Sequence, residues 1–333
     1  MKKLTLLFVL LTGHVTISQV NIDQILEIGI DNAQRFSQDY FQPAGEGVVN
    51  GMSSGWYNSA AAKKLFHFEI GIVGNASFVR EEKQSFRLNE NDYTDITFRN
   101  GPSVQSVANA FGENESDVVL VFAEGTAGEV EITLPDGLGG TGVNFMPTGY
   151  LQFGVGLSKG TELKGRFLPK IEAGDNTEIQ LYGVGVQHEL TSWIFGWKRW
   201  PVKISGIIGY TNIKGSYDFT EDSAIDGEGQ KVELKANSWL VSGIVSTKLP
   251  VLNFYAGLGF YTGSSTTDLL GTYRIENGPL VSQTVTDPLS VEHDESGVKA
   301  TIGAKLSLTF FRVNLDYTLQ NYNNVSLGLN FGW

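Results

Sequence analysis

The sequence contains no cysteine among its 333 residues. This absence excludes disulfide bonds, thiol catalysis and a lipid-modified N-terminal cysteine, and it suits a protein exported through an oxidising compartment. Histidine is also scarce: His14 belongs to an expected leader, and His67, His188 and His293 are far apart in the sequence. Only His188 has a serine nearby, Ser192, and no catalytic motif surrounds the pair. We therefore expect no enzymatic activity, no cofactor and no metal site.

Long hydrophobic runs are missing as well. The chain starts with two lysines, a short apolar run from Leu4 to Leu11 and small residues up to Ser18, which predicts a signal peptide over residues 1–18. No later stretch approaches the roughly 18 uninterrupted apolar residues of a membrane-spanning helix. A mature chain that enters a membrane must then do so as a barrel, whose alternating strands keep the mean hydropathy low, here -0.07.

Positively charged residues are in the minority, with 24 lysines and arginines against 36 aspartates and glutamates. The formal net charge is -12, and removal of Lys2 and Lys3 with the leader gives -14, since -12 minus 2 is -14. Such a chain lacks the basic stripe that a phosphate backbone requires, so we expect no nucleic-acid partner.

The C-terminal residues alternate strictly between large apolar and small or polar side chains. The apolar set is Val325, Leu327, Leu329, Phe331 and Trp333, and the other set is Ser326, Gly328, Asn330 and Gly332. This period of two predicts a strand with one apolar face, which would aggregate at an exposed edge but closes the wall of a transmembrane barrel. The spacing of Gly328, Phe331 and Trp333 resembles the C-terminal sorting signal of bacterial outer-membrane proteins, which implies membrane insertion by the barrel-assembly machinery.

Similar alternation recurs along residues 63–333. Strands are expected at 66–78, 118–124 and 128–134, with about nine more after residue 147. The pattern predicts an all-β fold, a transmembrane antiparallel up-and-down β-barrel of about 12 strands, or about 14 if the polar segment 80–117 hides another pair. The last strand should pair with the one near residue 70. On composition alone, a soluble exported β-sandwich or propeller is the alternative, because these folds are also rich in glycine.

The connections between the expected strands are of two kinds. Counted back from the C-terminus, one end of the barrel receives the connections 310–312, 249–253, 191–201 and 158–160. The other end receives 321–324, 264–296, 220–233 and 172–176, which include the long acidic segments. Short periplasmic turns with longer external loops are typical of outer-membrane barrels, so the pattern favours a barrel over a sandwich.

Residues 19–62 lack strand alternation and are expected to form an N-terminal helical or plug segment. An amphipathic pattern predicts a helix from Gln24 to Phe36, and the proline and glycine residues within 40–47 should end it. A compact glycine-rich stretch follows. Its candidates for a plug inside the barrel are Trp56, Tyr57 and Asn58.

If the apolar strand faces meet lipid, the opposite faces line the lumen, and cations outnumber anions there. The residues singled out as a substrate site in the lumen are Lys164, Arg166, Lys299, Lys305 and Asp316. Two interpretations stay open. The charges either pair with one another and fill the lumen, or bind anionic head groups such as carboxylates.

The segment Gly51–Ala60, with Trp56-Tyr57-Asn58-Ser59-Ala60 directly before the first strand, resembles the N-terminal region of the FadL/TodX-type hydrophobic-compound transporters. That family carries a Tyr/Asn-Pro-Ala sequence there, and Ser59 replaces the proline in this chain. Met146-Pro147-Thr148 is similar to a Pro-Thr strand entry in the same family. The layout also resembles a distantly related, uncharacterised outer-membrane β-barrel family. The resemblance implies a plugged barrel of about 14 strands that passes hydrophobic molecules, including sideways into the membrane.

We therefore expect passive uptake of hydrophobic or amphipathic small molecules, such as long-chain fatty acids, across the outer membrane of a Gram-negative bacterium. The expected partners are membrane lipids and lipopolysaccharide, the barrel-assembly machinery and a hydrophobic small molecule. The alternative is a structural or interaction barrel, a surface scaffold or secretion accessory without transport activity, which would use loop 264–296.

Overall fold

The computed structural model describes residues 22–114, 117–126, 128–173, 176–193, 200–219, 227–276 and 282–332. The signal peptide expected at 1–18 and the terminal Trp333 lie outside these ranges. Within them, no helix combines the length and the apolar composition needed to cross a membrane.

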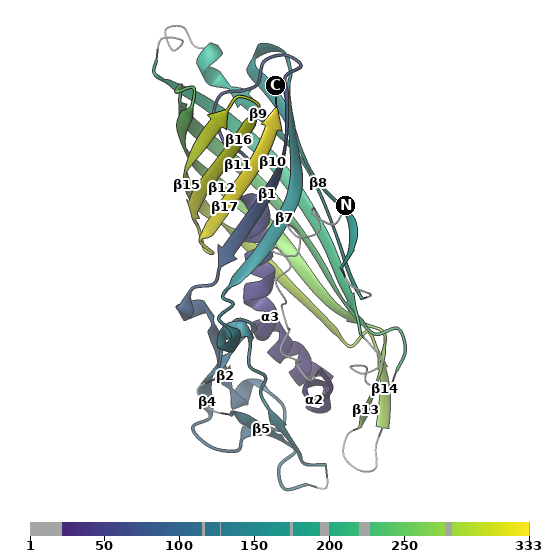
Figure 1. Cartoon of the computed structure of the whole chain (residues 1–333). Coiled ribbons are helices and arrows are strands. Elements are labelled where there is room, and N and C mark those ends of the chain that lie inside the picture. The colour runs from purple at the N-terminus through teal and green to yellow at the C-terminus, as the bar shows by residue number, and fades with distance from the viewer. Residues whose placement is uncertain are drawn as a thin grey trace.

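Antiparallel strands form a closed barrel (Figure 1). In chain order they are β1 (Phe68–Phe78), β7 (Phe145–Gly156), β8 (Thr161–Ala173), β9 (Thr177–Glu189), β10 (Val202–Asp218), β11 (Lys231–Thr247), β12 (Leu252–Leu270), β15 (Leu289–Leu308), β16 (Phe311–Leu319) and β17 (Asn324–Gly332). The last strand pairs with the first, with Ile70 opposite Phe331. The predicted all-β antiparallel barrel and its closing pair are confirmed.

The barrel of the described chain has these ten strands, not the 12 to 14 predicted from the sequence. The predicted hairpin does form, as β5 (Val119–Phe122) and β6 (Val130–Thr133), but it joins β3 (Ile96–Phe98) in a separate sheet. A second small sheet pairs β2 (Ser85–Asn89) with β4 (Val104–Ala108). These strands are too short to cross a bilayer, which takes about 9–11 residues. Together they make up the lobe, residues 79–144, at one end of the barrel (Figure 1).

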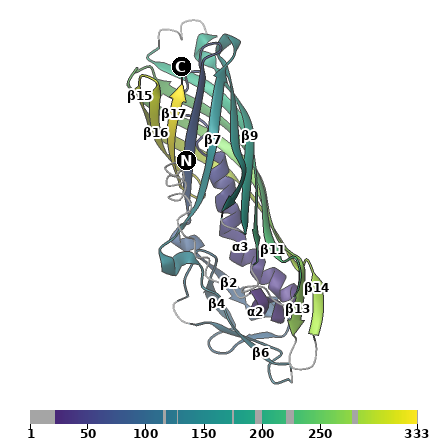
Figure 2. The ribbon, with the colours of Figure 1, turned by 45° about the vertical axis from the view of Figure 1, so that its right-hand side comes forward.

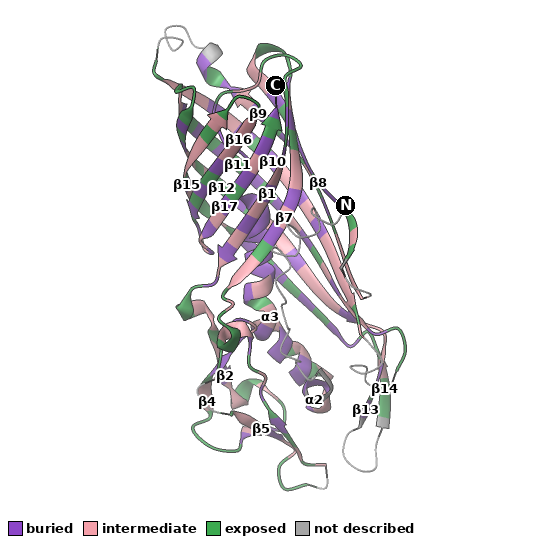
Figure 3. Cartoon of the chain, viewed as in Figure 1, coloured by how far each residue is buried: buried purple, intermediate pink, exposed green. Residues whose placement is uncertain are grey.

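The apolar side chains of an exposed band point outward from the barrel strands, whereas the inward face combines glycines, polar residues and buried apolar side chains such as Tyr150, Leu240 and Ile244, which gives the alternating burial in Figure 3. The exposed band includes Ile70, Phe153, Phe167, Tyr182, Val241, Phe254, Leu258, Ile302, Leu315, Leu327 and Phe331. It ends along a row of cross-strand partners, where Trp239 lies opposite Tyr210 and Phe260 lies opposite Val298. Beyond this row outward residues such as Lys235 and Glu292 are charged, so the sheet continues past the apolar band.

The longest connections of the barrel lie at one end, although β16 and β17 are joined there by only residues 320–323, and the other end has mostly short turns. At the short-turn end, β15 and β16 are joined by two residues, 309–310, and the C-terminal end of β17 also lies there (Figure 1). The long-loop end carries the lobe, helix α2 (Ile22–Glu27) and the hairpin of β13 (Thr272–Glu276) and β14 (Ser282–Thr286). Much of the expected loop 264–296 is therefore strand. It shows no apolar period because its outward face lies beyond the apolar band.

Helix α3 (Ile30–Ser53) enters the barrel from the long-loop end and runs along the lumen (Figure 2). The predicted break at 40–47 is wrong, because the helix continues through Pro43. Relative to alanine, its proline and three glycines cost about 6 kcal/mol of helix propensity, which packing must offset. A Cβ would lie 3.1 Å from the Met146 side chain at Gly47, and 2.9 Å from the Thr148 hydroxyl at Gly51. Glycine therefore lets a helix fit into this narrow barrel.

The barrel wall is split at the long-loop end between β7 and β8. These strands pair only between Leu151–Gly156 and Glu162–Phe167, although β7 continues to pair with β1, and β8 with β9. Each unpaired stretch contains a proline, Pro147 in β7 and Pro169 in β8, which has no backbone N–H to donate. Figure 1 shows α3 between the two diverging parts of the wall.

Helix α3 also covers the free edge of β15, whose residues 289–299 pair with β12 but not with β16. Gln34 accepts a hydrogen bond from the Ser290 N–H at 3.0 Å, and Gln38 donates to the Glu292 carbonyl at 2.6 Å. The two amides lie four residues apart on one helix face. They occupy a strand edge that would otherwise favour aggregation.

The lobe packs against the opposite side of the helix. Phe36 and Tyr40 of α3 share a buried core with Leu88 and Leu120 of the lobe and Leu269 of β12. The outer half of α3 is therefore enclosed between the extended sheet and the lobe (Figure 2).

Candidate functional site

The C-terminal end of α3 lies inside the lumen against two buried cations, which we call the helix-end contacts. Arg166 of β8 donates to the carbonyl oxygens of Met52 and Ser54, both at 2.6 Å. Lys299 of β15 donates to the carbonyl oxygen of Ser53 at 2.8 Å. The last carbonyls of a helix lack intrahelical partners and carry partial negative charge. Arg166 and Lys299 therefore satisfy the end of the helix.

After α3 the chain continues through the lumen, where glycines of the wall receive its aromatic side chains. Trp56 is 1% exposed, with the Arg166 guanidinium 3.7 Å from its ring centroid. A Cβ at either Gly185 or Gly209 would lie 2.7 Å from the indole. Tyr57 occupies the space that a side chain at Gly257 would fill. This is close packing, and each aromatic ring requires a glycine opposite it.

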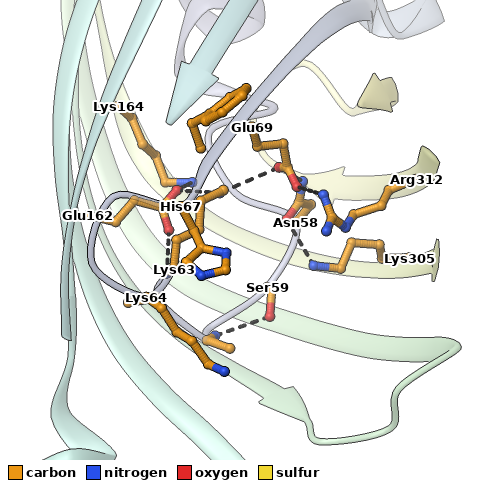
Figure 4. A pocket seen from close by; sticks show the side chains of 13 residues that line it. Asn58, Ser59, Lys63, Lys64, His67, Glu69, Glu162, Lys164, Lys305 and Arg312 are labelled. Carbon is orange, nitrogen blue, oxygen red and sulfur yellow. Dashed lines mark hydrogen bonds and ion pairs between the residues drawn. The ribbon is translucent and has the colours of Figure 1, made fainter. Parts of the chain in front are cut away.

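A cavity of about 360 Å³ remains near the short-turn end, between this segment and the wall (Figure 4). We call it the short-turn cavity. It is lined by Asn58, Ser59, Ala61, Ala62, Lys63, Lys64, His67, Phe68, Glu69, Glu162, Lys164, Lys305 and Arg312. Its volume is at the lower end of the range of small-molecule sites.

Ion pairs run across one side of this cavity. Glu162 lies 2.7 Å from the Lys63 ammonium and 3.0 Å from that of Lys164. Glu69 lies 3.0 Å from Arg312 and 3.5 Å from Lys63, and it also accepts from Asn58 at 3.0 Å. Burial lowers the pKa of Lys63, but the carboxylates of Glu162 and Glu69 outweigh it and raise that pKa above its ordinary value.

The lumen residues predicted from the sequence are divided among separate sites. Lys164 and Lys305 meet in the short-turn cavity, and Asn58 lies between Glu69 and Lys305. Arg166 and Lys299 belong to the helix-end contacts. The remaining predicted residue, Asp316, accepts a hydrogen bond from the Tyr255 hydroxyl at 2.9 Å. The five are not one site.

The predicted insertion motif occupies both faces of β17. Gly328 faces the lumen, where a Cβ would overlap with the Asn314 amide. Phe331 is 45% exposed, and its ring centroid lies 5.2 Å from that of Phe311.

Four charged residues of the cavity are not among the lumen residues predicted from the sequence: Lys63, Lys64, Glu162 and Arg312. Glu162 shares its parity with Lys164, and Arg312 with Asp316, so strict alternation would have placed both in the lumen. Arg312 was assigned to a turn instead. Lys63 and Lys64 precede β1, so strand alternation does not predict which way their side chains point.

Metal-ligating groups do not gather anywhere in the described ranges: no cluster of three or more histidine, aspartate and glutamate residues occurs there. His188 contacts the Thr161 hydroxyl at 3.0 Å.

Comparison with solved structures returns several barrels at low similarity. Ail, the attachment invasion locus protein of Yersinia pestis, is 9% identical over 80% of this chain and 97% of its own, with a TM-score of 0.26. The transport unit of the autotransporter AIDA-I from Escherichia coli is 10% identical over 87% of this chain and 98% of its own, with a TM-score of 0.30. The P. putida toluene transporter TodX is 8% identical over 79% and 89%, with a TM-score of 0.22.

At these TM-scores the likenesses assign no function, and the fold assignment rests on strand pairing within the chain. No curated protein matches the sequence. One family model matches residues 1–333 in full, and the chain belongs to that family, a family of unknown function (DUF6588).

Proposed function

We propose that this protein is an outer-membrane barrel of a Gram-negative bacterium for passive uptake of hydrophobic or amphipathic small molecules, such as long-chain fatty acids. The observation that carries the proposal is how the lumen is filled. Small barrels usually fill their interior with side chains of the wall. Here the wall contributes glycines opposite the segment together with inward apolar side chains such as Leu240, Ile244 and Tyr255, and a separate N-terminal segment packs against them and occupies the remaining space.

The contacts of that segment with the wall suit a plug that can move. Around Ser59 they are neutral hydrogen bonds: its hydroxyl lies 3.3 Å from that of Ser246, and its carbonyl accepts from Gln187 at 2.9 Å. Each such bond contributes a net of about 1 kcal/mol, since water replaces it when it breaks. The neighbouring Trp56, Tyr57 and Ala60 pack in a buried apolar cluster with the wall, so displacement of the segment requires a ligand that offsets the loss of those contacts.

The outer surface supports a membrane location. The continuous band of exposed apolar residues would be costly in water, and in a bilayer it meets lipid. Membrane lipids and lipopolysaccharide would surround this band, and the barrel-assembly machinery would insert it. The split between β7 and β8 supports a sideways path for a hydrophobic molecule.

The proposal can be tested by locking the segment, because the chain has no cysteine of its own. The pair S59C/S246C would join the segment to β11, where the two hydroxyls lie 3.3 Å apart. The matched pair T301C/T318C would join β15 to β16, where the hydroxyls lie 2.8 Å apart, and leaves the segment free.

The measurement is uptake of radiolabelled oleate by Gram-negative cells that lack their own uptake barrel and express equal amounts of each variant. Uptake should stop in oxidised S59C/S246C, return on reduction, and stay at the wild-type rate in T301C/T318C. Equal uptake by the oxidised and reduced forms of S59C/S246C would overturn the plug mechanism.

A scaffold or secretion accessory is the second candidate, and the lobe favours it. The lobe shares a buried core with α3. Uptake of a small molecule through the barrel does not require a folded lobe of this kind at the long-loop end. Wild-type cells that take up no more oleate than cells without the barrel would favour this scaffold.

A further inference from the structure

The short-turn cavity combines charges in a way that the fold alone does not require. Its lining carries five permanent cations (Lys63, Lys64, Lys164, Lys305 and Arg312) against two carboxylates (Glu69 and Glu162). Five minus two leaves an excess of three positive charges, in a protein whose net charge is -12. Lys64 is exposed to water, but the other four cations are buried or partly buried, and an excess of positive charge there favours the binding of an anion.

One cation in particular, Lys305, has no carboxylate bonded to it among the described residues, although Glu69 attracts it from farther away. Both carboxylates are already engaged, Glu162 by Lys63 and Lys164, and Glu69 by Arg312 and Lys63. Lys305 donates to the neutral amide oxygen of Asn58 at 3.2 Å, and it forms no ion pair within the described part of the chain. Figure 4 shows its ammonium beside Asn58 and near Arg312.

Apolar surface adjoins these charges. Phe68 lines the cavity and is 49% exposed, and the preceding Phe66 is 77% exposed. Phe66 also has a φ of 62°, a conformation that costs an aromatic residue energy. An apolar rim beside a cationic pocket matches an amphipath that carries one negative end.

We infer that the short-turn cavity binds the anionic head group of an amphipathic molecule, a carboxylate or a phosphate, with Lys305 as its charge partner and Phe68 against its alkyl chain. This inference rests on the proposed function, since it names the substrate class that the barrel passes. Arg312 presents further N–H groups beyond the one that Glu69 uses. The ligand would place a negative charge in direct contact with Lys305, which Glu69 attracts only from farther away.

Calorimetry on the full-length protein in nanodiscs tests this directly. The probes are hexanoate, hexyl phosphate, uncharged hexanol and inorganic phosphate. The variants are K305Q, the charge-retaining K305R, and K170Q, which removes one positive charge from an exposed pair with Glu178 on β8 and β9, away from the cavity.

The anionic probes should bind wild type at least about tenfold more tightly than hexanol, since charge-assisted hydrogen bonds contribute about 1.5–3 kcal/mol. K305Q should lose about tenfold for the anions and nothing for hexanol, whereas K305R and K170Q should bind like wild type. Preference for hexyl phosphate over hexanoate would assign the site to a phosphate head group, and the reverse to a carboxylate.

Three outcomes would overturn the inference: equal binding of hexanol and hexanoate, an unchanged K305Q, or an equal loss in K170Q. If inorganic phosphate binds as tightly as hexyl phosphate, the claim that the ligand is amphipathic is wrong, and the cavity is a site for free anions. Because binding is measured without flux, this test and the locking test can fail separately. If the protein passes oleate but shows no preference for anionic probes, only the inference about the cavity is wrong. If it binds anionic probes but passes no oleate, only the proposed uptake is wrong.

Discussion

The helix-end contacts and the short-turn cavity both contain lysine and arginine, but these cations have different partners in the two places. Around the end of α3, Arg166 and Lys299 donate to backbone carbonyls of the segment that they enclose and to neighbouring hydroxyl and amide oxygens. In the cavity, Lys305 has only a neutral amide for a partner. A lumen cation is therefore structural where a helix ends against it, and available to a ligand where it lines a cavity and has no ion pair in the described chain.

The difference follows from where the helix stops. The carbonyls at a helix end carry about half a negative charge, and the buried Asp316 carboxylate adds a full one near Arg166 and Lys299. Past Ser54 the segment is not helical and has no aligned dipole to offer. The cations beyond that level must find carboxylates, and the cavity has two carboxylates for five cations.

The largest expected effect comes from removing the guanidinium at the helix end. Arg166→Met keeps much of the side-chain volume but deletes two bonds to carbonyls and the stacking on Trp56. Breaking a buried charged contact typically costs about 3–5 kcal/mol, so the protection of residues 45–60 should fall by about that amount. Amide hydrogen exchange in detergent micelles measures it.

Two variants make this result specific. Arg166→Lys keeps the charge but not the planar fork, so it should recover only part of the protection. Lys305→Gln should leave the exchange of residues 45–56 at the wild-type level, because its one hydrogen bond to the segment is at Asn58. A similar loss in K305Q would erase the distinction between the two sites.

A smaller effect is expected from filling the glycine floor under Trp56. In Gly209→Ala the new Cβ would lie 2.7 Å from the indole, and overpacking of this kind costs about 1–3 kcal/mol. Gly206→Ala on the same strand is the matched control, because no atom lies within 4 Å of its Cβ position. Thermal unfolding, followed by tryptophan fluorescence, should separate the two, and equal midpoints would show that the segment adapts freely.

The parts of the fold that could be predicted are those in which one residue period repeats over a whole bilayer. The alternation of Leu327 and Leu329 with Gly328 identified the closing strand, and the separation of short from long connections held. The strand number was wrong because β5 and β6 alternate correctly but are only four residues long each. Length, rather than period, decides whether a strand crosses.

The helix and the site were less predictable for a different reason. Local propensity ends a helix at Pro43, but the lumen wall continues it, and nothing in the local sequence reports that wall. Likewise parity places Arg166 and Lys164 on one face of β8, whereas their roles depend on the end of α3 and on Glu162. A single strand pattern cannot tell a paired cation from an unpaired one.

The smallest expected effect concerns the long-loop end, and it tests whether that end loosens independently of the helix end. His293 lies on β15 past the apolar band and packs at Gly45, facing Gln38, Asp39 and Glu46 of α3 and, across the strand pair, Ser265 of β12. Burial lowers its pKa below the ordinary value, although Glu46 and Asp39 oppose this.

The folded state therefore binds the proton of His293 less readily than the unfolded state does. The free energy of unfolding should then fall as the pH drops from about 7 through the folded pKa, by at most about 1.4 kcal/mol per pH unit. His293→Asn should flatten this dependence in the amide exchange of residues 30–45, while His67→Asn, at an exposed position, should not. A slope that persists in H293N would assign the pH response to other groups, and a matching response in residues 50–60 would show that the two ends move as one.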